Sequence, residues 1–304
     1  MTPALVRQHV SHADSAPRVD RCARARDWSE IQERMLVPLY EAVYDRLEVG
    51  PATRLLGLRC GSGLALLMAA SRGAAVTGAD TAAPERLALA RERLLPDTRP
   101  GRGAGAGRGT RARTAARLLD GPPADADGAD ADGAGTDGAG TAPYTLVTVF
   151  EPVGCLAGDS EGLGELLAGA LPSAARGAAV VLAGWGPPER CATSSVLRVA
   201  TRLADPPRGA HGWRPARRDD LEEVAGRAGL KPDGSGRVAC PFGYADLDSA
   251  VRGLLSTGLF DAAVAASDAK QVDKELAEAL HPHRRPDGTV WMRNVFRYLI
   301  ARVP

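Results

Sequence analysis

The segment LLGLRCGSG, residues 55–63, decides the fold of this chain. Residues 55–58 form an apolar run that predicts a short buried strand, the end of the segment predicts a tight turn, and residues 64–71 predict a helix. Glycines in such a turn permit positive φ angles and let a bound molecule lie against bare backbone. A second predicted strand, residues 74–79, is followed by Asp80. Because a carboxylate there can accept hydrogen bonds from both hydroxyls of a ribose, the segment predicts an adenosine-binding site.

The spacing of the glycines separates the possible adenosine ligands. A dinucleotide fingerprint, G-x-G-x-x-G, would place a third glycine where this chain has Leu66. A Walker-type phosphate loop would end in G-K-S/T, and no lysine stands near this turn. Both pyrophosphate interpretations are therefore disfavoured, and with them a nicotinamide-dependent oxidoreductase.

The segment instead resembles the first motif of class I S-adenosylmethionine-dependent methyltransferases, which runs D/E-x-G-C-G-S/T-G after an apolar pair. The resemblance covers roughly two thirds of the chain and includes a ribose-binding acid at the second strand. Further segments resemble strands and helices of the family, at residues 72–80, 84–93, 144–150, 177–183, 219–230 and 296–302. Within the family, the chain is similar to the small-molecule branch that includes ubiquinone- and menaquinone-biosynthesis methyltransferases. The resemblance implies an α/β fold with a doubly wound, mostly parallel seven-stranded sheet of the Rossmann-like methyltransferase type. It also implies an antiparallel last strand, preceded by a helical insert.

The resemblance implies S-adenosylmethionine as the cofactor and indicates which residues would contact it. The candidates lie in the turn and at the ends of the second, third and fourth strands: Cys60, Gly61, Ser62, Gly63, Asp80, Thr81, Asp120, Phe150 and Glu151. Asp80 would bind the ribose, and Asp120, after a predicted third strand at residues 114–119, would bind the adenine amino group. Glu151 could orient a substrate, act as a base, or be a simple surface carboxylate. No catalytic residue is assigned.

Two positions depart from the family pattern. The family's first acid, whose carboxylate helps to hold the methionine end of the cofactor, falls at Gly57, and its first glycine falls at Arg59. Losing a charged hydrogen bond weakens binding about ten- to a hundred-fold, or roughly 1.5–3 kcal/mol. The Arg59 side chain could crowd the methionine portion, turn outward, or pair with the cofactor's carboxylate. The sequence thus predicts methyl transfer to a small-molecule acceptor, with a non-catalytic cofactor-binding or regulatory module as the alternative.

Composition excludes several other classes. The 304 residues carry a formal net charge of +1 and are 4% aromatic, which argues against nucleic-acid binding. The five cysteines form no C-x-x-C pair and have no histidine cluster beside them, so neither a zinc site nor a disulfide framework is indicated. No apolar run approaches the roughly 20 residues of a membrane span, and the first residues lack a secretory h-region. We expect a cytoplasmic protein with a small-molecule substrate. The sequence leaves the oligomeric state and the methyl acceptor open.

Patterning along the chain predicts the domain organisation. Residues 1–26 are polar and predicted to be disordered, and residues 27–304 are predicted to form one methyltransferase-like domain. Within it, residues 99–143 form a low-complexity insert rich in Gly, Arg, Ala and Asp, and residues 245–285 form a helical insert expected to shape the substrate pocket. A capping box at Ser29-x-x-Gln32 predicts the start of the leading helix.

Three further expectations concern the edges of the site. Trp28, Tyr40 and Tyr44 on the leading helix could face the cofactor or pack in the core. Residues 238–244 predict a sixth strand, and residues 288–300 a long terminal strand or hairpin partner.

Overall fold

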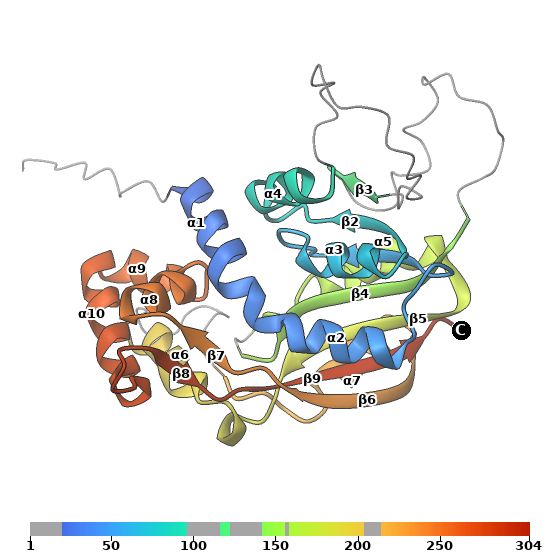
Figure 1. The fold of residues 1–304 in the computed structure, drawn as a ribbon. Helices are drawn as coiled ribbons and strands as arrows, with labels where there is room; N and C mark the ends of the chain where they lie inside the picture. The colour runs from blue at the N-terminus through green and yellow to red at the C-terminus, as the bar shows by residue number, and fades with distance from the viewer. Residues whose placement is uncertain (1–19, 96–115, 122–141, 156–157, 204–213) are drawn as a thin grey trace, which may run out of the picture.

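The computed structural model describes most of the chain: residues 20–95, 116–121, 142–155, 158–203 and 214–304. Residues 1–19 of the segment predicted to be disordered (1–26), most of the low-complexity insert and the start of the predicted third strand lie outside these residues. Figure 1 shows a twisted central sheet between two layers of helices, with a further helical group at one end.

The main sheet has the predicted doubly wound architecture. Its seven strands, within the described residues, lie in the order β3-β2-β1-β4-β5-β9-β6 (Figure 1). Their bounds are β1 Arg54–Leu58, β2 Ala75–Ala79, β3 Ala116–Leu119, β4 Tyr144–Val153, β5 Ala174–Trp185, β6 Lys231–Ala239 and β9 Val295–Arg302. Strands β1 to β5 are parallel, and β9 runs antiparallel to both of its neighbours. This confirms the predicted fold class, including the antiparallel last strand.

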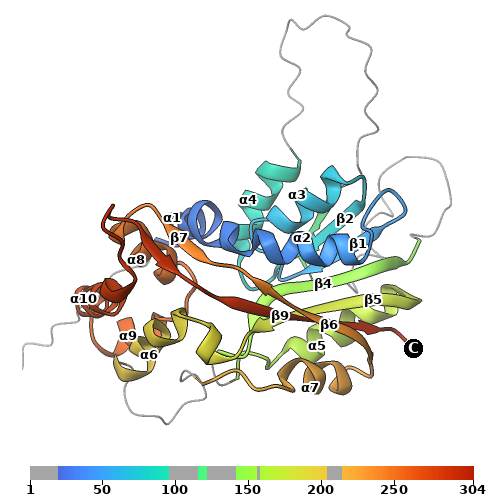
Figure 2. The ribbon, with the colours of Figure 1, turned by 60° about the horizontal axis from the view of Figure 1, so that its bottom comes forward.

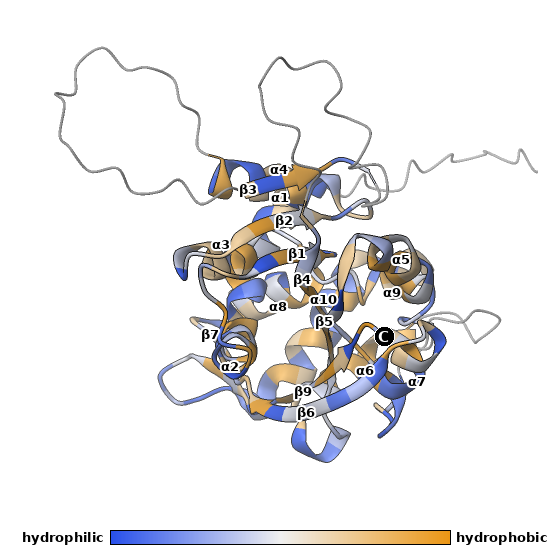
Figure 3. Ribbon diagram, turned by 90° about the vertical axis from the view of Figure 1, so that its right-hand side faces the viewer, coloured by the Kyte–Doolittle hydropathy of each residue, from blue (hydrophilic) through white to orange (hydrophobic). Residues whose placement is uncertain are grey.

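Helices cover both faces of the sheet because each strand of the parallel part is apolar on both sides. One cluster of buried side chains joins the sheet to α2 and α3, and a second joins it to α5 and α7. These helices and the flanking α4 have the bounds α2 Val37–Arg46, α3 Leu64–Ser71, α4 Pro84–Leu94, α5 Leu163–Ala170 and α7 Asp220–Arg227. In Figure 3 the outer helices carry both hydrophilic and hydrophobic residues, as expected for helices with one buried face.

A helical group precedes the last strand, as predicted. Figures 1 and 2 show α8 to α10 gathered beside α6 at one end of the sheet, next to the small antiparallel sheet of β7 and β8. The bounds are α6 Thr193–Leu203, β7 Phe242–Tyr244, α8 Leu247–Leu255, α9 Asp261–Ala266, α10 Ala269–Leu280 and β8 Val290–Met292. Short 3₁₀ turns follow α5 at Leu171–Ser173, β5 at Pro188–Arg190 and α10 at His281–His283. Across the described segments, no helix combines the length and apolar character that crossing a bilayer requires.

The leading helix begins earlier than the sequence predicted. Helix α1 spans Arg21–Asp27, and Asp20 caps it by accepting a hydrogen bond from the Ala23 amide. The predicted capping box is wrong, because Ser29 lies inside the helical segment and its hydroxyl bonds elsewhere. A wide π turn, Trp28–Gln32, and a tight 3₁₀ turn, Glu33–Leu36, connect α1 to α2. The irregularity precedes Pro38, which has no amide hydrogen to donate to the preceding turn.

Two strand predictions need correction. The predicted sixth strand at 238–244 divides between the end of β6 and the separate strand β7, and the predicted strand at 288–300 divides between β8 and β9. Strand β6 begins at Lys231 and was missed because its first seven residues, KPDGSGR, are polar or lack a large apolar side chain. It lies at the sheet edge, where a strand meets solvent and tolerates proline and charge.

Candidate functional site

The strand register brings the predicted site residues to one edge of the sheet. Leu58, the last residue of β1, pairs with Ala79 of β2 on one side and with Val149 of β4 on the other. The next residue along each strand is therefore Arg59, Asp80 or Phe150, all at the same level. This is the carboxyl edge of the parallel strands, where ligands bind in open α/β sheets.

The turn after β1 keeps a glycine-type backbone even at a residue that is not glycine. Gly61 and Gly63 have φ angles of 57° and 78°, and Arg59 has a φ of 47°. A left-handed conformation costs a non-glycine residue about 1–2 kcal/mol. Arg59 stands where the resembled family has glycine, and it keeps the left-handed backbone in spite of this cost.

Asp80 is a buried carboxylate at the tip of β2. Its side chain accepts a hydrogen bond of 3.0 Å from the Gly61 amide, which ties the strand tip to the turn. Burial raises the pKa of this carboxyl group, and the nearby Glu151 raises it further. An acid in this position retains acceptor capacity toward a neighbouring hydroxyl group.

Glu33 closes the other side of the turn from the leading helix. It is 2% exposed, and its carboxylate accepts hydrogen bonds from the Ser62 hydroxyl and, at 3.3 Å, from the Leu64 amide. Arg93 Nη1 on α4 donates to the same carboxylate at 3.0 Å and to the Ser62 carbonyl at 2.9 Å. Arg93 Nη2 also donates to the Ser29 hydroxyl at 2.7 Å. The buried charge is thus paired and hydrogen-bonded, which a carboxylate away from water requires.

Trp28 carries a polar atom with no partner. Its Nε1 is buried and makes no hydrogen bond with any described residue. A Cβ atom built on Gly61 would lie 3.3 Å from Trp28 Nε1 and 3.3 Å from Glu33 Oε1, so one donor and one acceptor face the same point above the turn. The Arg86 guanidinium lies over the face of the indole ring, 4.1 Å from the ring centroid.

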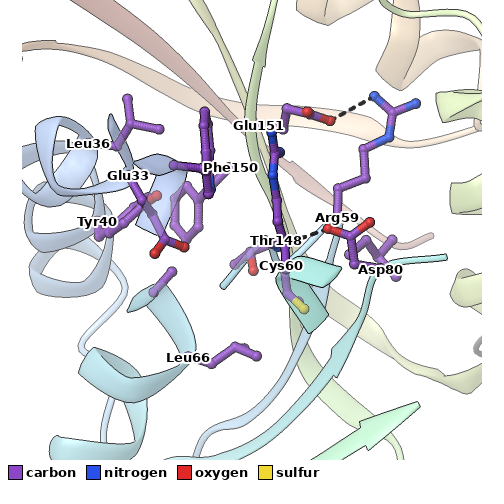
Figure 4. Close-up of a pocket in the computed structure, with 16 residues that line it drawn as sticks. Glu33, Leu36, Tyr40, Arg59, Cys60, Leu66, Asp80, Thr148, Phe150 and Glu151 are labelled. Carbon is purple, nitrogen blue, oxygen red and sulfur yellow. Dashed lines mark hydrogen bonds and ion pairs between the residues drawn. The ribbon is translucent and has the colours of Figure 1, made fainter. Parts of the chain in front are cut away.

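Arg59 extends across the sheet edge to the end of β4. Figure 4 shows its side chain turned away from Glu33 and toward Glu151, and Arg59 Nη1 donates to Glu151 Oε2 at 3.2 Å. Pairing with Glu151 was not among the orientations that the sequence analysis considered for this side chain. The pair is half-exposed, with 25% and 41% of the two side chains accessible.

Several hollows meet around this ion pair. A small cavity of about 30 Å³ lies beside the turn, lined by Glu33, Tyr40, Gly61 and Phe150 among others (Figure 4). Arg59 also lines a second hollow of about 150 Å³ and a third of about 160 Å³. Asp80 and Glu151 border a more open hollow of about 360 Å³ beside α1. The Arg59 side chain therefore separates spaces that lie next to one another.

The structure brings most of the predicted residues together, but not all of them to a cavity. Cys60, Gly61, Asp80, Thr81, Phe150 and Glu151 line the hollows. Ser62 is fully buried in the Glu33 network, and Gly63 caps α3 against Ala90. Asp120 follows β3 as predicted, but its exposed side chain pairs with Arg91. Its proposed contact with adenine stays a prediction.

The leading helix contributes two cavity residues that the sequence analysis had considered and one that it had missed. Trp28 and Tyr40 line the small cavity, whereas Tyr44 is a core residue whose hydroxyl donates to the Ala65 carbonyl at 2.8 Å. Glu33 was not predicted. The available signal was its spacing, because it falls three and seven residues before Leu36 and Tyr40 on the buried stripe of the helix. A charge on such a stripe needs a partner.

The 160 Å³ hollow has an aromatic wall. The Trp185 ring lies 4.7 Å from Phe296 and 6.1 Å from Phe242, measured between ring centroids, and Leu259 from the helical insert completes the wall. Arg59 and Glu151 form its boundary toward the turn.

Comparison with known proteins gives structural neighbours only. No protein-family model matches the chain, and no curated protein matches it. Among solved structures, it is similar to YjhP from Escherichia coli, with 17% identity over 93% of this chain and 99% of that chain and a TM-score of 0.49. It is also similar to an S-adenosylmethionine-dependent methyltransferase from Geobacter sulfurreducens in complex with S-adenosyl-L-homocysteine, with 16% identity, 90% and 92% coverage and a TM-score of 0.45. A third is the geranyl diphosphate C-methyltransferase of Streptomyces coelicolor A3(2), with 14% identity, 90% and 82% coverage and a TM-score of 0.43. Likenesses of this strength assign no substrate or activity to the chain.

Proposed function

We propose that this chain binds S-adenosylmethionine at the carboxyl ends of β1, β2 and β4 and transfers its methyl group to a small-molecule acceptor. The observation that carries the proposal is the strand register, which sets the glycine turn beside the buried carboxylate of Asp80. A glycine turn and an acid at neighbouring strand tips are the parts that an adenosine ligand needs. We expect its relatives within the family to be the methyltransferases that act on small molecules.

The adenosine half of the cofactor fits the residues present. Asp80 has a buried carboxylate with acceptor capacity for ribose hydroxyls. The adjoining 150 Å³ hollow, lined by Thr81 and Gly121, lies where the adenine would follow the ribose. Asp120 would reach the adenine only after leaving Arg91.

The methionine half fits the chemistry of the turn but needs a side chain to move. The unpartnered Trp28 Nε1 and the Glu33 carboxylate both face Gly61, and they offer a donor and an acceptor to a zwitterion. The cavity beside them holds only about 30 Å³, room for one or two water molecules. Rotation of the Arg59 side chain away from Glu151 would join this cavity to the neighbouring hollows.

S-adenosylmethionine would supply a methyl group activated by a sulfonium, so the protein need not provide an electrophile. The work left to this chain is to hold the acceptor in line and to exclude water. The aromatic wall of the 160 Å³ hollow suits a largely apolar acceptor, and Glu151 at its boundary can accept a hydrogen bond from the acceptor's polar group.

One observation favours the alternative, a non-catalytic module derived from a methyltransferase. The small cavity and the Arg59–Glu151 ion pair leave the site closed along the path that the cofactor would take. The binding experiment that decides is calorimetry of the full chain with S-adenosylmethionine, S-adenosylhomocysteine and NAD. We expect both adenosyl ligands to bind and NAD to give no heat. If neither adenosyl ligand binds, the methyltransferase proposal is wrong and the scaffold alternative stands.

A further inference from the structure

The position at which the resembled family carries an acid at the end of its first strand is tightly packed in this chain. It would stand at Gly57, where a Cβ atom would lie 2.8 Å from Leu66 Cδ2. Leu66 is itself 1% exposed in the core between the sheet and α3. A side chain on β1 at this position therefore requires the buried Leu66 side chain to shift.

A buried carboxylate reaches the same turn from another element. Glu33, on the 3₁₀ turn of the leading helix, lines the small cavity together with Gly57, Arg59 and Gly61. Its partners Ser62, Leu64 and Arg93 fix the carboxylate in place, so it is oriented before any ligand arrives. Figure 4 shows it pointing into the cavity opposite Asp80.

Trp28 supplies a hydrogen-bond donor beside the acceptor oxygens of Glu33. Trp28 Nε1 is buried and has no hydrogen-bond partner among the described residues, and it lies as close to the Cβ position of Gly61 as Glu33 Oε1 does. An unpaired buried N–H is costly, and a ligand carboxylate would satisfy it. An acceptor and a donor thus line the same cavity beside Gly61, and these are the two kinds of group that an ammonium and a carboxylate require.

We propose that Glu33 and Trp28 recognise the zwitterionic amino-acid end of the cofactor. Glu33 accepts from the ammonium group in place of the acid missing at Gly57, and Trp28 donates to the carboxylate. The inference rests on the proposed function. It implies that the broken motif marks a carboxylate moved to another element, with the binding site retained.

Ligands that lack one group at a time test each contact. The full-length protein is titrated with S-adenosylhomocysteine, its deaminated analogue, its decarboxylated analogue, and 5′-methylthioadenosine, which lacks the whole amino-acid end. The wild type should bind S-adenosylhomocysteine at least tenfold more tightly than the deaminated analogue, because a charged hydrogen bond is lost. If the wild type binds both equally, the proposal for Glu33 is overturned, whatever the variants do.

Variants then assign the effect to residues. Glu33→Gln should weaken binding of S-adenosylhomocysteine and of the decarboxylated analogue at least tenfold and leave the other two ligands unchanged. Trp28→Phe should weaken S-adenosylhomocysteine and the deaminated analogue about fivefold, the effect of one neutral hydrogen bond. Glu30→Gln is the matched control, since Glu30 is exposed on the same helical segment and loses the same charge.

The pattern separates this inference from the broader proposal. Equal weakening of all four ligands in Glu33→Gln would mean a merely structural role and would overturn the inference, while leaving the adenosine site intact. Failure of every ligand to bind the wild type would overturn both.

Discussion

The candidate site has two ends, the tip of β2 at Asp80 and the turn after β1 beside Glu33. These two ends obtain their polar groups in different ways. At the tip of β2, Asp80 follows its strand directly, as the motif predicts, and its carboxylate accepts a hydrogen bond from the Gly61 amide of the turn. At the turn after β1, the polar groups come from the leading helix and α4, which contribute Glu33, Trp28 and Arg93. The first end is visible in a short stretch of sequence, whereas the second exists only after distant helices dock. A broken motif therefore says little about whether a site is lost.

The largest expected effect is a loss of stability when Glu33, at the turn after β1, is replaced. Glu33→Ala should lower the free energy of unfolding by about 3 kcal/mol, because it leaves the Arg93 guanidinium half-buried without its carboxylate. Urea denaturation measures the loss, with Glu30→Ala as the exposed control on the same helix. A loss below about 1 kcal/mol, the range of an exposed pair, would show that this network does not stabilise the turn.

Placing an acid at position 57, where the resembled family has one, should destabilise the protein. Gly57→Asp would place a Cβ atom 2.8 Å from Leu66 Cδ2 and bring a charge into the core, so we expect a loss of about 1–3 kcal/mol in stability. We also expect no gain in affinity for S-adenosylhomocysteine, because Glu33 already supplies the carboxylate. A variant that keeps its melting temperature and binds more tightly would contradict both points.

Asp80, at the tip of β2, should have the larger influence on the affinity for adenosine ligands. Asp80→Ala should weaken S-adenosylhomocysteine at least tenfold, about 1.4 kcal/mol, because the contacts with the ribose hydroxyls disappear. Unlike Glu33→Gln, it should weaken 5′-methylthioadenosine equally. Asp120→Ala provides the comparison, since Asp120 is exposed and paired with Arg91, and its effect should be smaller. An unchanged dissociation constant in folded Asp80→Ala protein would remove Asp80 from the site.

The smallest expected effect is the change in stability when Arg59, which lies between the two ends of the site, is replaced. Arg59→Gly should leave stability within about 1 kcal/mol of the wild type, because a half-exposed ion pair is lost while a left-handed backbone is relaxed. Arg59→Ala loses the same pair and keeps the strain, so thermal unfolding should show it to be the less stable of the two. If the alanine variant equals the glycine variant, the φ angle of Arg59 stores no strain.

The sequence predicted the parts of the fold in which burial and periodicity agree. Strands β1, β2, β4 and β5 have mostly apolar, buried central residues, and each was predicted close to its position. Strand β6 was missed because an edge strand meets solvent and carries polar residues such as Asp233. The capping box was wrong because the Ser29 hydroxyl lies within hydrogen-bond distance of Ser62 and Arg93, far along the chain. The site divides in the same way: Asp80 follows from local sequence, whereas Glu33 depends on how a helix docks.

The leading helix also sets the order in which the site can be completed during synthesis. Gln32 Oε1 accepts a hydrogen bond from the Tyr244 hydroxyl, and Arg24 pairs with Asp261, contacts that join the chain across 212 and 237 residues. Contacts of such long sequence separation form late, because the loops between them must close first. The contacts that hold Glu33 itself lie nearer in sequence, at Ser62, Leu64 and Arg93, so they can form in a nascent chain before the contacts with Tyr244 and Asp261. A shortened chain ending before Tyr244 would therefore keep Asp80 and the partners of Glu33, but it would lose the two contacts that tie Gln32 to β7 and Arg24 to α9.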